Sequence, residues 1–373
     1  MDARWNAAEG VAVLLERAGD RLRRRRVREC LDLLDRAEAL GADPLDTGGA
    51  RWQACMLLGD FAGAWAVSDA VLARADPAGF NRRDRPFHRR AVWNGTPLAG
   101  RWVLVRCYHG LGDIIHFCRY LPLLAGIARG VAVQAPDVMH ALLARVPGVR
   151  AVLPLGDDVP LPDFDVDAEL MELPHAFRST LATLPAAVPY LTVQPERVAA
   201  QAARLGGAGR LRVGIAWAAG AWDGGHRSLP PDRLGALMAV PGVDWVCLQR
   251  GPALAEAGAG MTFSDRGPRT DDVLDTAAMM RALDLVVSVD TMVAHLAGAL
   301  AVPVWTLLSH EADWRWMLGR DDSPWYPTMR LFRQPDPGDW ASVVAAVAAA
   351  LPDVKLPDVK LPGVRPRAGR VGR

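Results

Sequence analysis

The pattern of apolar and polar positions changes at about residue 100 of the 373-residue chain. Residues 1–80 are rich in Ala, Leu and Arg and show no strand-like alternation, which predicts helices. Beyond residue 100, short apolar runs alternate with longer amphipathic stretches. An alternating order of strand and helix predicts parallel sheets with helices on both faces. We therefore expect a helical region, residues 1–85, followed by two α/β units.

The first α/β unit is expected over residues 100–205. Its strands and helices are predicted at 102–107 (strand), 113–127 (helix), 131–134 (strand), 137–145 (helix) and 150–153 (strand). Residues 154–195 are rich in Pro, Asp and Leu and are expected to be irregular with short helices. The polar segment 81–100 is broken by prolines and glycines and is expected to be a linker.

The second α/β unit is expected over residues 210–335. Its strands are predicted at 211–217, 245–248, 285–288, 304–308 and 329–332. Its helices are predicted at about 230–240, 271–283 and 291–300. A closing helix at 339–351 is capped by Asp339, and the Pro-punctuated repeats of residues 352–373 are expected to be disordered.

The helical region carries a weak internal repeat. The sequence Ala-Asp-Pro at 42–44 recurs at 75–77, and Gly59-Asp60 is expected to turn the chain between two helices. This spacing resembles a tetratricopeptide repeat, whose period is ~34 residues. The alternative is a plain helical hairpin. The basic run Arg23–Arg26 is expected to be a solvated helix end rather than a phosphate site.

Composition narrows the possible functions. The formal net charge is +1, which argues against nucleic-acid or membrane-surface binding driven by bulk charge. The five cysteines are scattered, without the spacing of a disulfide framework or a zinc site. No leader is expected at the N-terminus, and no apolar stretch approaches the ~20 residues of a membrane helix, so a cytoplasmic location is expected.

The first candidate site follows the apolar run 102–105. It contains Gly110, Gly112 and Asp113, at the point where a strand should pass into a helix. The glycines leave room for a ligand near the helix N-terminus. Asp113 has two interpretations: a helix cap that accepts backbone hydrogen bonds, or a general base. The spacing lacks a full GxGxxG, so a nicotinamide fingerprint is not supported.

The second candidate site follows the run 285–287. The hydroxyl of Thr291 and the N–H groups of Met292 and Val293 are candidates to hold a diphosphate after Asp290, with His295 one helical turn further on. The alternative is a capped helix with a packed histidine.

Two more segments complete the candidates. The Gly-rich loop 218–228 follows a strand and ends near Arg227, which is placed to neutralise a phosphate. The aromatic residues of 313–316 and 323–327 either line a cleft and stack on a sugar or base, or pack between domains.

Taken in order, these motifs resemble the heptosyltransferase-type glycosyltransferases of family 9, and more closely bacterial tetratricopeptide-repeat proteins with such a domain. The resemblance covers about residues 100–350. It is carried by Gly-Leu-Gly-Asp at 110–113 with 117–122, and by 213–217, 227–229, 248–251, 290–291 with 294–300, and 313–316 through 332–334.

The resemblance implies a GT-B architecture, in which two Rossmann-like domains face each other across a cleft. It also implies inverting transfer from a nucleotide-sugar without a metal, so no cofactor is expected beyond the donor itself. Asp113 then matches the catalytic base and Arg227 the cation for the donor phosphates. The donor side comprises Trp217, Arg227, Gln249, Asp290, Thr291, Met292, Val293 and His295.

The sequence departs from that family in the second turn. Met292 replaces a usual glycine, Arg227 stands where lysine is common, and the loop before it differs, so ADP-heptose is not assumed as donor. The acceptor is expected to be a glycan, protein or peptide, and the helical region is a candidate to bind a protein partner. The alternatives are a non-catalytic interaction protein with a degenerate transferase fold, or a nucleotide-sugar epimerase.

Overall fold

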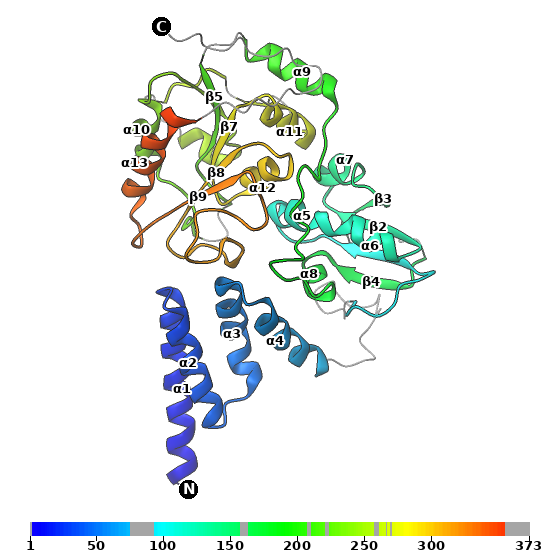
Figure 1. The fold of residues 1–373 in the computed structure, drawn as a ribbon, viewed down its shortest axis with the longest axis vertical. Helices are drawn as coiled ribbons and strands as arrows, with labels where there is room; N and C mark the ends of the chain where they lie inside the picture. Colours follow the sequence, from blue (N-terminus) through cyan, green and yellow to red (C-terminus); the bar gives the residue numbers. More distant parts are fainter. Residues whose placement is uncertain are drawn as a thin grey trace.

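The computed structural model describes residues 2–74, 93–156, 163–206, 210–220, 224–256, 261–265, 267–268 and 271–354. Helices form the N-terminal part of the chain, and two α/β units lie beyond them (Figure 1). This is the predicted fold class. Among the described residues, no helix combines the length and apolar character needed to cross a bilayer.

In the described part of the helical region, residues 2–74, four helices each pack against the next: α1 (Asp2–Arg23), α2 (Val27–Ala39), α3 (Pro44–Leu58) and α4 (Phe61–Ala73). The Asp43 carboxylate caps α3 by accepting from the Leu45 N–H. Gly59 ends α3 at φ 75°, and Asp60 caps α4, so the predicted turn is confirmed. Because the second Ala-Asp-Pro copy lies outside the described residues, the tetratricopeptide repeat stays a prediction.

The basic run 23–26 does not behave as one solvated end. Arg24 and Arg26 are exposed, but Arg25 is part-buried and donates to the carbonyl oxygens of His310 (3.2 Å) and Ala312 (2.6 Å). Arg25 also has φ 57° between α1 and α2. The prediction was therefore wrong for Arg25, because its partners lie about 285 residues away in sequence and leave no local signal.

The first sheet has the strand order β3-β2-β1-β4, with every pairing parallel. Its strands are β1 (Trp102–Arg106), β2 (Gly130–Ala135), β3 (Val149–Pro154) and β4 (Val166–Glu169). Strand β4 lies in a stretch predicted to be irregular. It escaped prediction because it has only four residues and carries two acids. One of them, Asp167, is fully buried in an ion pair with Arg106 of β1.

The helix predicted at 113–127 is interrupted. It consists of α5 (Leu111–Phe117), the 3₁₀ turn η3 (Cys118–Tyr120) and α6 (Leu121–Ile127). Pro122 stands at the start of α6, where its missing N–H costs nothing, but it disfavours helical geometry in the preceding residue. The remaining elements of this half are short: η4 (Asp137–Met139), α7 (His140–Leu143), η5 (Leu170–Glu172) and α8 (Leu173–Ala176).

The second sheet is also parallel, in the order β6-β5-β7-β8-β9. All five predicted strands are found: β5 (Leu211–Ala216), β6 (Val243–Cys247), β7 (Leu285–Val289), β8 (Val304–Leu308) and β9 (Met329–Arg333). Its helices are α10 (Leu234–Met238), α11 (Val273–Arg281), α12 (Met292–Ala299) and the predicted closing helix α13 (Trp340–Ala350).

A helix precedes the second sheet unit and a short turn follows it. Helix α9 (Pro195–Arg204) packs on α11, where Arg197 pairs with Asp272 and Asp275. Residues 351–353 form a 3₁₀ turn after α13, and residues 355–373 lie outside the described part of the chain.

One buried core joins all three parts. It runs from Phe61 of the helical region through Val105 of β1 and Leu296 of α12 to Trp325. A second cluster covers the other face of the second sheet. Helices α3 and α4 therefore share one hydrophobic core with the two sheets. Helices α1 and α2 pack with α3 in a separate cluster.

Candidate functional site

Each sheet has one point where the strand order reverses. In the first sheet, β2 and β3 lie on one side of β1 and β4 on the other; in the second, β6 lies on one side of β5 and β7 on the other. In open α/β sheets, ligands bind beyond the carboxyl ends of the strands at such points. The expected ligand-binding positions are therefore the turns after β1 and β4 in the first sheet, and those after β5 and β7 in the second.

Asp113 is the third residue of α5, which begins at Leu111 with Gly110 as its N-cap. One carboxylate oxygen accepts from the Gly110 N–H at 3.2 Å, and the other from Arg315 Nη2 at 2.7 Å. The carboxylate is partly exposed. The capping contact predicted for Asp113 is present, and the exposure leaves the carboxylate accessible to a ligand.

Arg315 holds the Asp113 carboxylate from the second half of the chain. It is buried, pairs with Asp313 at 2.8 Å, and lies against the rings of Phe117 and Trp314, with its guanidinium carbon 5.0 and 4.6 Å from their centroids. Burial lowers the pKa of Arg315, but the carboxylates of Asp313 and Asp113 outweigh it and raise the pKa overall. Arg315 therefore remains a fixed positive charge between the two halves.

The aromatic residues of 313–327 mainly pack between domains. Trp316, Trp325 and Tyr326 are fully buried. Trp314 packs edge-on against Trp52 of α3, with ring centroids 5.2 Å apart. Of the two interpretations of this cluster, packing is the one that the geometry shows.

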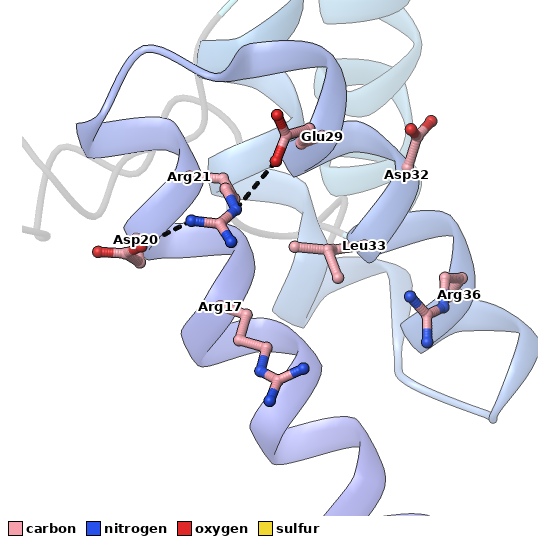
Figure 2. Close-up of a pocket in the computed structure, with 7 residues that line it drawn as sticks. All are labelled: Arg17, Asp20, Arg21, Glu29, Asp32, Leu33 and Arg36. Atoms are coloured by element: carbon pink, nitrogen blue, oxygen red, sulfur yellow. Dashed lines mark hydrogen bonds and ion pairs between the residues drawn. The ribbon is translucent and has the colours of Figure 1, made fainter.

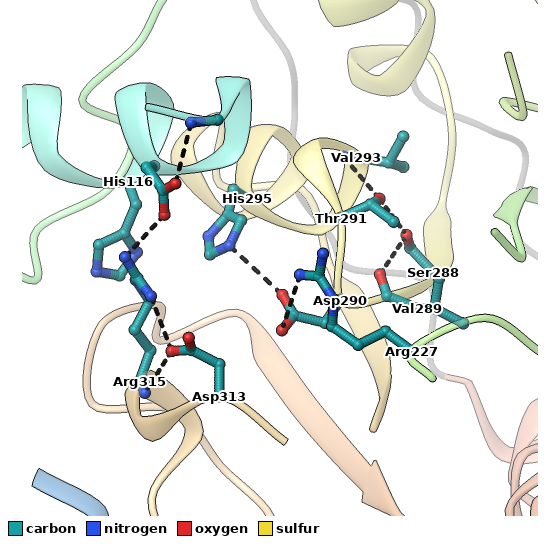
Figure 3. Close-up of polar contacts among 12 residues, drawn as sticks. His116, Arg227, Ser288, Val289, Asp290, Thr291, Val293, His295, Asp313 and Arg315 are labelled. Carbon is teal, nitrogen blue, oxygen red and sulfur yellow. Dashed lines mark hydrogen bonds and ion pairs between the residues drawn. The ribbon is translucent and has the colours of Figure 1, made fainter. Parts of the chain in front are cut away.

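Asp290 is the buried charge at the second reversal point. Its two oxygens lie 3.6 Å from His295 Nε2 and 3.7 Å from Arg227 Nη1, as Figure 3 shows. Among the described residues, none forms a hydrogen bond with Oδ2. Burial acts to raise the pKa of Asp290, but His295 and Arg227 outweigh it, so the pKa lies below its usual value. Asp290 thus binds the loop after β5 to the turn after β7.

Thr291 caps α12. Its hydroxyl accepts from the Val293 N–H at 3.1 Å and lies 3.2 Å from the Ser288 hydroxyl. One of the N–H groups predicted to hold a diphosphate is therefore already bonded within the protein.

The two candidate turns meet where α5 crosses α12. A Cβ at Gly112 would lie 2.9 Å from His295 Cδ2 and 3.6 Å from the Met292 Cα. His295 Nδ1 and His116 Nδ1 each lie 2.9 Å from the Tyr326 hydroxyl. This contact between α5 and α12 brings the predicted site residues of the two turns close together, and Arg227 lies beside them. These residues are Gly110, Gly112, Asp113, Asp290, Met292 and His295.

Trp217 and Gln249 lie at the same edge of the second sheet, but their contacts are internal. Gln249 Oε1 accepts from the N–H groups of Trp217 and Ala218, and Nε2 donates to the carbonyls of Ala218 and Arg250. Trp217 is buried and stacks on Phe263. Gln249 thus braces the loop that leads to Arg227. Residues 221–223 of that loop lie outside the described part of the chain.

Sequence reasoning missed a group at the first reversal point. Glu169, the last residue of β4, accepts a hydrogen bond from the Tyr108 hydroxyl at 2.7 Å and bonds His109 Nε2 through its other oxygen. Burial acts to raise the pKa of Glu169, but the hydrogen bonds from His109 and Tyr108 bring it below its usual value. His109 directly precedes the glycine motif in the sequence, whereas Glu169 lies in β4, a strand that the sequence did not predict.

A separate pocket of about 540 Å³ lies between α1 and α2. Figure 2 shows its lining residues, Arg17, Asp20, Arg21, Glu29, Asp32, Leu33 and Arg36. Three arginines face three acids, and Arg21 pairs with both Asp20 and Glu29. These charges balance, so the pocket offers no net charge to a ligand. Across the described residues, no group of three or more His, Cys, Asp or Glu side chains is arranged to hold a metal.

Comparison with known proteins gives one sequence relative and several similar folds. No protein-family model matches the chain. Protein FlbA of Caulobacter vibrioides is 27% identical over 291 residues, which cover 70% of this chain and 48% of FlbA. The chain thus spans about half the length of this curated relative.

The fold is of the GT-B type, with two parallel-sheet units. A family 9 glycosyltransferase of Veillonella parvula superposes with a TM-score of 0.51 at 11% identity, over 70% of this chain and 99% of that structure. The E. coli ADP-heptose lipopolysaccharide heptosyltransferase II gives 0.49 at 15% identity, over 67% and 98% of the respective chains. At 11% identity, the similarity to the Veillonella structure shows the fold alone; activity has to be argued from the site.

Proposed function

We propose that this protein is an inverting glycosyltransferase that moves a sugar from a nucleotide-sugar to an acceptor hydroxyl without a metal. The observation that carries the proposal is the meeting of the two reversal points. The contact of Gly112 with His295 brings an accessible carboxylate, Asp113, close to the ion pair that the partly exposed Arg227 forms with the buried carboxylate of Asp290. A transferase needs this combination of a proton acceptor and a positive charge for the leaving group.

In the proposed reaction, Asp113 takes the proton of the acceptor hydroxyl. The hydroxyl oxygen forms a bond to the anomeric carbon as the bond from that carbon to the phosphate oxygen breaks. The electron pair leaves with the nucleoside diphosphate. Arg227 and the N-terminus of α12, whose dipole is positive there, stabilise the departing charge. Gln249 and Trp217 act indirectly, by fixing the loop that carries Arg227.

The first experiment is a calorimetric binding screen with ADP-, GDP-, UDP-, CMP- and dTDP-sugars. Saturable binding of one nucleotide that Arg227→Ala abolishes would support the donor site. The matched control is Arg233→Ala, which alters an exposed arginine in the same half that pairs with Asp232. A folded protein that binds none of the five nucleotides contradicts the proposal.

Two contacts within the site favour a second candidate function, that of a non-catalytic interaction protein. Asp113 is already paired with Arg315, and the Thr291 hydroxyl already caps its helix. A site whose polar groups already bond to one another can serve as part of a rigid scaffold. Absence of nucleotide binding together with an intact fold is the result that this candidate expects.

A further inference from the structure

The segment 310–318, which carries Arg315, has little regular structure to fix its shape. It contains one 3₁₀ turn, η9 (Trp314–Trp316). The residue that ends this turn, Met317, has φ 46°, a backbone conformation that costs free energy for a residue with a Cβ and persists where surrounding contacts hold it. The shape of the segment therefore depends on contacts from other parts of the chain.

The helical region supplies backbone contacts at both ends of this segment. Arg25, between α1 and α2, donates to the carbonyl oxygens of His310 and Ala312 at 3.2 and 2.6 Å. At the other end, the Leu57 carbonyl of α3 accepts from the Leu318 N–H at 2.9 Å. The segment is thus bonded to the helical region before and after its 3₁₀ turn.

Between these two ends, the indole of Trp314 joins the helical region to Arg315. Trp52 of α3 packs edge-on against Trp314, with ring centroids 5.2 Å apart, and Trp314 also packs on the buried cluster of α1, α2 and α3. The guanidinium carbon of Arg315 lies 4.6 Å from the centroid of the same indole. A displacement of Trp314 would therefore move the surface on which the Arg315 guanidinium lies.

Arg315 in turn orients Asp113. Its Nη2 donates to one carboxylate oxygen at 2.7 Å, and the Gly110 N–H donates to the other at 3.2 Å. Each carboxylate oxygen can accept two hydrogen bonds, so both keep a lone pair for an incoming hydroxyl. Arg315 therefore fixes the direction of the carboxylate and leaves it able to accept a proton.

We propose that Trp52 and Arg25 are positioning residues, which hold the segment 310–318 so that Arg315 keeps Asp113 in its reactive orientation. This inference rests on the proposed glycosyl transfer and gives the helical region a part in its chemical step. Loss of these contacts slows the transfer but leaves the nucleotide bound, because Arg227 and Asp290 pair with each other outside the segment.

The test measures release of the nucleotide from the ADP-, GDP-, UDP-, CMP- or dTDP-sugar that binds in the calorimetric screen, with water or glycerol as the acceptor hydroxyl. Rates are expressed per nucleotide-binding site counted by calorimetry, so that unfolded protein does not lower them. Trp52→Leu removes the aromatic contact, whereas Trp52→Phe keeps a ring. The matched control is Trp65→Leu, because Trp65 of α4 instead donates to the Ser179 carbonyl of the first α/β unit at 2.7 Å.

Trp52→Leu should lower kcat about 10- to 100-fold, the scale expected when a catalytic group is displaced by about 1 Å. Nucleotide affinity should stay close to the wild-type value. Trp52→Phe and Trp65→Leu should keep the wild-type kcat. Arg25→Ala removes a second contact to the same segment and should also lower kcat, so the test stands if Trp52→Leu does not fold.

The route through Arg315 is tested by combining substitutions. In a protein that already carries Arg315→Gln, Trp52→Leu should lower kcat no further, because residues that act as one unit have non-additive effects. The positioning inference is overturned by a wild-type kcat in Trp52→Leu and Arg25→Ala, by equal losses in Trp52→Leu and Trp65→Leu, or by a full further loss beside Arg315→Gln. A wild-type protein that releases no nucleotide overturns the proposed function, and the positioning role with it.

Discussion

Gly112 of α5 lies directly against His295 of α12, so the turn that carries Asp113 and the turn that carries Asp290 touch each other. A Cβ at position 112 would stand 2.9 Å from His295 Cδ2. His295 cannot yield freely, since its Nδ1 is bonded to the Tyr326 hydroxyl and its ring stacks on Trp316. The glycine is therefore required by the close approach of two helices from different halves of the molecule.

Gly112→Ala should lower the free energy of unfolding by about 1–3 kcal/mol, as overpacking in a buried contact does. Urea unfolding followed by tryptophan fluorescence measures it. The matched control is Gly126→Ala in α6, where no atom lies within 4 Å of the added Cβ and the change should be neutral or slightly stabilising. Equal stability of the two variants would show that α5 and α12 do not touch in solution.

Asp113→Asn should reduce turnover by about 10²–10⁴-fold, because the amide cannot take the proton of the acceptor hydroxyl. The amide keeps the size of the side chain and a hydrogen bond to Arg315. Rate measurements at saturating donor, with nucleotide affinity measured in parallel, separate chemistry from binding. Asp137→Asn, an exposed acid after β2, is the control and should leave turnover unchanged. Wild-type turnover in Asp113→Asn contradicts the role of base.

The sequence predicted most of the architecture because strands buried on both faces have strong local signals. The runs 211–216 and 285–289 are apolar throughout or nearly so, and both became central strands. The turns that carry Asp113 and Asp290 were found because each directly follows such a strand. Asp113 and Asp290 could thus be named without knowing that their turns meet.

What the sequence could not predict depends on distant partners. Strand β4 has four residues, and Asp167 within it is stabilised by Arg106 across the sheet. Arg25 resembles a solvated cation until its carbonyl partners at 310 and 312 are known. Arg315 likewise becomes informative only beside Asp113, which is 202 positions away in sequence. Each case is a long-range contact without a local pattern.

Arg25→Ala should lower the free energy of unfolding by about 1–3 kcal/mol. The arginine bonds two carbonyl oxygens of the second half, and their loss leaves part-buried acceptors unsatisfied. Burial lowers the pKa of Arg25, yet the guanidinium stays charged at any working pH. Arg24→Ala serves as the control, since its pair with Asp20 is an exposed i,i+4 contact that contributes little to stability. Urea unfolding would contradict the docking role if both variants matched the wild type.

His116 should make the fold sensitive to acid before the carboxylates titrate. Its ring is fully buried, and burial, followed by the positive charge of Arg119, holds its pKa well below the usual value. In the unfolded chain, His116 binds a proton near pH 6.5, whereas in the folded protein it stays neutral at that pH. The contribution of neutral His116 to the free energy of unfolding is therefore complete above pH 6.5. It is lost as the pH falls below that value, by up to about 1.4 kcal/mol per pH unit.

The change that tests this is His116→Gln, which keeps a polar partner for the Tyr326 hydroxyl but cannot ionise. The variant should be less stable than the wild type at pH 7.5, because the packed ring is lost, but should lose less stability between pH 6.5 and 5. Urea unfolding at pH 7.5, 6.5, 5.5 and 5 measures both effects. His140→Gln, which alters a partly exposed histidine, should keep the wild-type dependence. An unchanged pH dependence in His116→Gln would mean that the buried ring accepts its proton without unfolding, and the charge of Arg119 beside it makes that outcome unfavourable.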